Sequence, residues 1–175
     1  KGLDYDLWIG PAAFRPYSPL WVPWNWRGWM PFGGGAIGDW ICHVVDPSFW
    51  ALDLDAPTTV LAEVTDYDPV KQGLCYPSAA KFTFEFPAKP ARGPVKLVWH
   101  DGNATIPKPK DFPADEKIPG TGAILMGDKG MIVHGSHGGG GCHLVPDSLM
   151  EQYSGKSAPA QKLTRINGHG WDWAD

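Results

Sequence analysis

Residues 38–54 read GDWICHVVDPSFWALDL, an apolar stretch that carries charged residues through its middle. From Ala36 to about Leu52, apolar residues recur at positions 37, 40, 41, 44, 45 and 49, which predicts a helix with one apolar face. Spacings of four, three and four residues place a second stripe along one side of that helix, formed by Asp39, His43, Asp46 and Trp50. A charged group in an apolar element must be paired, lie at a helix end or face a cleft, so this stripe is the first candidate for function.

The rest of the chain predicts an irregular start followed by strands. Residues 1–35 hold five prolines, which prevent long regular elements there, and Pro47 either kinks the central helix or begins a new one capped by Asp46. Alternating or continuous apolar runs predict strands at 58–65, 81–86, 95–100, 123–126 and 131–134, with GDKG at 127–130 as a hairpin turn. We therefore expect an α+β domain with an open, mainly antiparallel sheet, one face covered by the 36–52 helix and the other available for homo-oligomer contacts.

Composition restricts the partners of the chain. Its 175 residues suit one domain, residues 1–175, and the 19 acidic residues exceed the 15 Lys and Arg, so neither nucleic acid nor an anionic membrane surface is expected. No apolar run approaches the roughly 20 residues of a membrane span. The three cysteines are widely spaced and predict neither a disulfide framework nor a zinc knuckle. Ten Trp suit a protein that stacks on sugars or other flat ligands, and no compartment is indicated.

The pair Asp39 and His43 is the first candidate for catalysis. A carboxylate one helical turn before an imidazole can orient it or share a ligand with it, and imidazole suits proton transfer near neutral pH. The structural alternative has Asp39 capping the helix and His43 hydrogen-bonded in the core. A metal could be held by Asp39, His43 and Asp46, or by a second set around SHGGGGCH, but zinc ligands usually stand in tighter pairs, so no metal is predicted.

Four blocks give the chain a recognisable pattern. LDYDLWIGPA at 3–12, NWRGW at 25–29, FGGGAIGDWICHVVDPSFWAL at 32–52 and GDKGMIVHGS at 127–136 resemble the C-terminal substrate domain of the Gfo/Idh/MocA (glucose-fructose oxidoreductase and inositol dehydrogenase) family. The resemblance extends from Leu3 to the C-terminal GHGWDW. It implies that this chain is a fragment of a longer protein whose N-terminal Rossmann domain, with its glycine-rich nucleotide loop and catalytic lysine, is missing.

The resemblance also implies the roles of individual residues. Asp39 and His43 match the DxxxH motif of the family, so His43 would be the acid/base toward a sugar or polyol hydroxyl and Asp39 would orient the hydroxyl or the imidazole. Trp26, Arg27 and Asp46 are the implied substrate-binding residues. NAD or NADP would be the cofactor of the full-length protein, with none bound by this fragment alone, which we expect to be inactive.

Two other functions stay open at this stage. Some relatives are NAD-dependent glycosidases, which oxidise the sugar transiently and reduce it again. A non-enzymatic carbohydrate-binding domain that uses its Trp-rich loops is the third hypothesis. The sequence specifies neither the sugar, nor the choice between NAD and NADP, nor the size of an oligomer.

Overall fold

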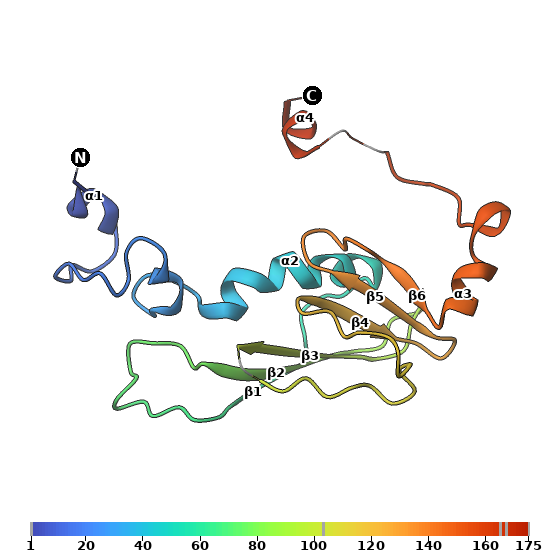
Figure 1. Cartoon of the computed structure of the whole chain (residues 1–175), viewed down its shortest axis with the longest axis horizontal. Coiled ribbons are helices and arrows are strands. Elements are labelled where there is room, and N and C mark those ends of the chain that lie inside the picture. Colours follow the sequence, from blue (N-terminus) through green and yellow to red (C-terminus); the bar gives the residue numbers. More distant parts are fainter. Residues whose placement is uncertain (1, 103, 165, 167, 175) are drawn as a thin grey trace.

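The chain forms an α+β fold with one long helix and two sheets (Figure 1). The computed structural model describes residues 2–102, 104–164, 166 and 168–174. The α-helices are α1 (Tyr5–Ile9), α2 (Gly35–Ala51), α3 (Asp147–Gln152) and α4 (His169–Ala174), and two short 3-10 helices are η1 (Asn25–Gly28) and η2 (Gly155–Ser157). The strands are β1 (Thr59–Val64), β2 (Ala79–Phe86), β3 (Val95–Gly102), β4 (Gly122–Met126), β5 (Met131–Gly135) and β6 (His143–Val145).

Helix α2 confirms the helix predicted for residues 36–52. Pro47 lies inside it and neither ends it nor starts a new helix, so the interpretation of Asp46 as a cap is wrong. The helix begins without a side-chain cap, at Gly34, and its first residue Gly35 has a left-handed φ of 68°. A Cβ atom on Gly35 would lie 2.6 Å from the ring of Tyr76, whose hydroxyl donates to the carbonyl of Gly33 at 2.9 Å. Glycine is therefore required where α2 begins, because only it combines this φ with so close a neighbour.

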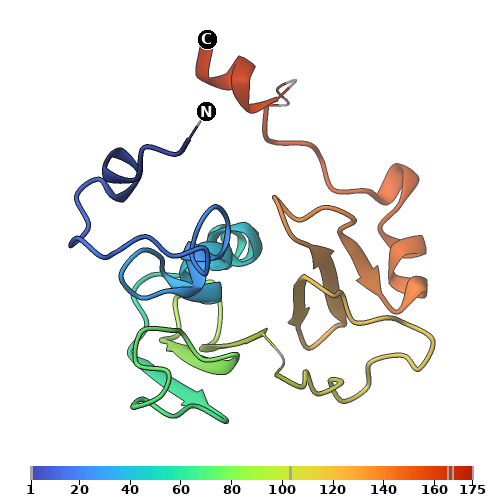
Figure 2. The ribbon, with the colours of Figure 1, turned by 60° about the vertical axis from the view of Figure 1, so that its left-hand side comes forward.

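The strands divide between two antiparallel sheets instead of forming one open sheet. The first has the order β1-β2-β3 and the second the order β4-β5-β6 (Figure 2). All five predicted strands are present, and the turn at 127–130 joins β4 to β5 as expected. The third strand of the second sheet, β6, has three residues and was not predicted, because a run that short carries little periodicity. The α+β class and the antiparallel pairing are confirmed.

Helix α2 lies against both sheets, through contacts with β3 and β4. The buried residues include Val44 on α2 and Phe86 and Trp99 in the first sheet, while a cluster of Phe112, Val133 and Val145 forms the core beside the second sheet. Full burial of a Val or Phe side chain contributes about 1.5–3 kcal/mol. The core thus fixes the buried face of α2 and leaves its polar stripe at the surface.

Two further sequence predictions concern the cysteines and membrane-spanning helices. In the described part of the chain all three cysteines are free, as expected from their spacing. Among the same residues, no helix combines the length and the apolar character that a membrane crossing requires.

Candidate functional site

The polar stripe of α2 is accessible to solvent. His43 and Asp46 are exposed and Asp39 is half-buried. Gly34, not Asp39, caps the helix, and His43 is not in the core. The structural alternative, in which Asp39 caps α2 and His43 is a core histidine, is therefore wrong for both residues.

The carboxylate of Asp39 is held by an arginine from the irregular N-terminal segment. Arg27, in η1, places Nε 3.2 Å from Asp39 Oδ2. Both side chains remain about one third exposed, so water and ligands can reach the pair. The structure thus brings together two of the predicted site residues, and Arg27 rather than His43 is the side-chain partner of this carboxylate among the described residues.

Two indole rings contact the guanidinium of Arg27. Its central carbon lies 4.2 Å from the ring centroid of Trp24 and 4.5 Å from that of Trp26, while Nη1 donates to the carbonyl of Trp24 at 3.3 Å. Cation–π contacts of this kind contribute about 0.5–1 kcal/mol each at exposed sites. Trp24 is 69% exposed, so one large aromatic surface beside the arginine is free to meet a flat ligand.

His43 belongs to a three-ring cluster that the sequence did not predict. The imidazole ring of His137 stacks on that of His43, with centroids 4.7 Å apart and planes 26° apart. Trp40 meets both imidazoles edge to face, at 5.7 Å from His43 and 5.4 Å from His137. Trp40 had been assigned to the apolar face of the helix by its spacing, yet it is 38% exposed.

The remaining predicted residues are placed less centrally. Trp26 contributes its ring to the Arg27 stack and is half-buried. Asp46 is exposed, and within the described residues it forms no ion pair with Arg27 or any other cation. Trp26 and Asp39 thus both contact Arg27, His43 follows Asp39 by one turn of α2, and Asp46 lies about one turn farther along the helix.

The metal-ligand sets considered from the sequence are not assembled in the described residues. Neither set of residues considered from the sequence forms a group of three or more metal-binding side chains in the described part of the chain. In the second set, His137 stacks on His43, while His143 lies 3.5 Å from Glu116. Both histidines thus have other side-chain partners among the described residues.

The glycines around the start of α2 lack the context of a nucleotide loop. Gly33, Gly35 and Gly38 have G-x-G-x-x-G spacing, but they follow a turn instead of a strand. A Cβ on Gly33 would lie 2.5 Å from the backbone of Arg27, and Gly35 is covered by Tyr76. Gly33 and Gly35 therefore serve close packing, whereas Gly38 has open space around its Cβ position.

The predicted site residues all lie in the segment that matches a known family. Residues 1–78 match the model of the oxidoreductase family, C-terminal alpha/beta domain, of the Gfo/Idh/MocA proteins. The predicted family membership is confirmed for these residues. The match covers less than half of the chain, and the block at 127–136 that also suggested the family lies outside it. No curated protein matches the chain.

Proposed function

We propose that this chain is the substrate-binding domain of an NAD(P)-dependent dehydrogenase that oxidises a hydroxyl group of a sugar or polyol. The observation that carries the proposal is the exposed His43 imidazole, one helical turn after Asp39 within the segment that matches the oxidoreductase family. An exposed imidazole beside a half-buried carboxylate suits exchange of a proton with a bound hydroxyl.

In this proposal His43 accepts the hydroxyl proton as the alcohol becomes a carbonyl, and returns it in the reverse direction. NAD(P), held by a separate Rossmann domain of the full-length protein, would supply the hydride acceptor. In this chain Gly33 and Gly35 pack against neighbouring residues instead. Asp39, fixed by Arg27, accepts a hydrogen bond from a second substrate hydroxyl. Its partner leaves part of the carboxylate exposed, so such a contact requires no rearrangement of the pair.

The substrate contacts follow from the chemistry of the surrounding side chains. Trp26 and Arg27 bind the substrate by stacking and by hydrogen bonding, and Asp46 contacts its distal hydroxyl groups. Sugars present apolar C–H faces and polar edges, so an aromatic ring beside charged hydrogen-bonding groups matches them. An open sheet face would carry the homo-oligomer contacts of the full-length protein.

The test uses the full-length protein with its bound nucleotide. His43→Asn should lower kcat with a sugar or polyol by about 10²–10⁴-fold, the usual contribution of a positioned acid/base, while the nucleotide stays bound. His100→Asn is the matched control, because His100 is on β3, outside the cluster around His43. Full activity of His43→Asn would overturn the proposed role.

The same preparation separates the two other functions. Release of a leaving group from a glycoside without net change in the nucleotide would identify a glycosidase. Sugar binding without any bound or added nucleotide, unaffected by His43→Asn, would identify a carbohydrate-binding domain.

A further inference from the structure

The loop between β5 and β6 contacts the helix that carries His43. The backbone N–H of His137 donates to the carbonyl of His43 at 2.8 Å, in addition to the ring stack between the two side chains. Ser136 Oγ lies 2.7 Å from His137 Nδ1, which orients the second imidazole. His43 is thus held at its backbone and at its ring by one residue, from a segment more than ninety positions later in the chain.

The loop holds His137 beside α2 in a backbone conformation that non-glycine residues rarely adopt. His137 has a left-handed φ of 57°, and the glycines at 138, 139 and 141 also have positive φ. Gly139 lies against α2, because a Cβ on it would be 3.6 Å from Pro47 and 3.9 Å from the buried ring of His134. A non-glycine residue in this region costs free energy, which the contacts with α2 must offset.

We infer that His137 is a positioning residue that acts through His43. This inference rests on the proposed function. The side chain of His43 is exposed and would otherwise sample several rotamers, each aiming its nitrogen atoms in a different direction. Stacking on His137, with Trp40 against the edges of both rings, restricts the imidazole to one orientation while leaving it accessible to a substrate. Small misplacements of a catalytic group can reduce turnover about 10²-fold, so the effect of this restraint on kcat can be measured.

The experiment compares two substitutions in the full-length holoenzyme. His137→Ala removes the stacked ring and should lower kcat about tenfold with little change in KM, because positioning affects the reacting geometry more than ground-state binding. His137→Phe keeps a flat ring and lacks ring nitrogens, so it should recover most of the lost kcat. His143→Ala is the control, because His143 is in the same half of the chain and lies beside Glu116.

Each outcome decides between the inference and the proposed function. If His137→Phe is as impaired as His137→Ala, the nitrogens of His137 are needed and positioning by stacking is overturned. If His43→Asn is inactive while His137→Ala keeps wild-type kcat, the inference fails and the proposed function stands. If His43→Asn is fully active, the proposed function itself fails. His137→Leu, which fills similar space without a flat ring, replaces His137→Ala if the latter does not fold, and unchanged kcat in it would also count against the inference.

Discussion

Arg27 Nε lies 3.2 Å from Asp39 Oδ2, and the guanidinium also contacts the rings of Trp24 and Trp26, so one side chain joins the proline-rich N-terminal segment to α2. The segment before α2 has few regular elements, so its position depends on side-chain contacts such as those of Arg27. The position of the predicted substrate residues beside Asp39 therefore depends on Arg27.

We expect Arg27→Ala to lower the free energy of unfolding by about 1 kcal/mol, since a partly exposed ion pair contributes about 0.2–1 kcal/mol and the two indole contacts add to it. Asp39→Asn removes only the ion pair and should cost less. Thermal or urea unfolding of both variants and the double variant gives the coupling energy directly. Equal losses for Arg27→Ala and Asp39→Asn would show that the indole contacts add nothing.

A matched pair of glycines tests the start of α2. Gly35→Ala places a methyl group against the Tyr76 ring at a left-handed φ, and we expect a loss of more than about 1 kcal/mol. Gly38 lies inside the same helix with open space around its Cβ position. Gly38→Ala should be stabilising by up to about 1 kcal/mol, because alanine is the better helix former. We expect the two substitutions to change the free energy of unfolding in opposite directions. Equal changes would contradict the packing described for Gly35.

The helix and the strands were predictable because their periodicity is local. The spacing of residues 36–52 alone specifies α2, and the stripe with Asp39 and His43 follows from it. The division into two sheets was not predictable, because it depends on which strands pair and no local pattern encodes that. Trp40 was misplaced for a related reason: helical spacing separates two faces, but it cannot reveal that a loop from residues 136–141 contacts the boundary between them.

His137 shows the same limit at the level of the site. Its sequence context, SHGGGG, predicts a loop and nothing about where that loop packs. The positive φ values of the loop glycines were foreseeable from residue type, whereas the stack on His43 arises from the tertiary arrangement of β5, β6 and α2. A histidine in a glycine-rich hairpin loop is the only signal that the sequence offered.

Acid titration tests the ion pair at the end of α2. A hydrogen bond from Lys89 and the positive charge of that residue lower the pKa of the Asp53 carboxyl. A lowered carboxyl pKa stabilises the folded state above the unfolded value, about 3.9, and this contribution disappears as the pH falls through the folded value. Asp53→Asn removes the charge, and asparagine tolerates the left-handed φ of 47° at this position. We expect the variant to be less stable at neutral pH and equal to wild type at strongly acidic pH. A constant difference at all pH values would contradict this assignment.

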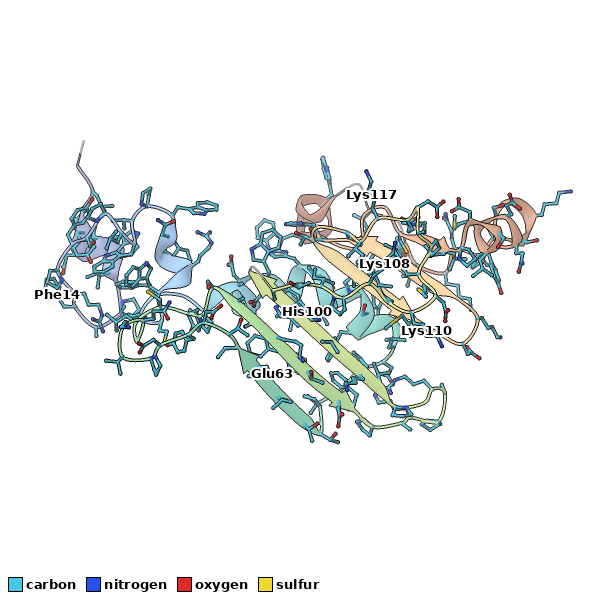
Figure 3. The ribbon with its side chains drawn as sticks, turned by 60° about the horizontal axis from the view of Figure 1, so that its bottom comes forward. Phe14, Glu63, His100, Lys108, Lys110 and Lys117 are labelled. Atoms are coloured by element: carbon cyan, nitrogen blue, oxygen red, sulfur yellow. The ribbon has the colours of Figure 1, made fainter. Side chains whose placement is uncertain are left out.

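A histidine on the outer face of the first sheet should also make stability depend on pH, in a higher pH range than Asp53 does. Strand register places Glu63, Lys81 and His100 in one row across β1, β2 and β3, and Figure 3 shows Glu63 and His100 on their strands. Burial, followed by the positive charge of Lys81, lowers the pKa of His100. The unfolded state therefore binds the proton more readily, so stability falls as the pH drops below about 6.5 until the folded value is passed.

His100→Gln removes this titration and should make stability less dependent on pH between about pH 7 and pH 5. Lys81→Gln should retain most of the dependence, because burial is the larger cause of the lowered pKa. Unfolding curves in urea, recorded across this range for wild type and both variants, provide the comparison, since all other titrating groups are shared. If the stability of His100→Gln changes in parallel with that of wild type, His100 does not titrate differently in the folded state and the row across the sheet has no role in the pH response.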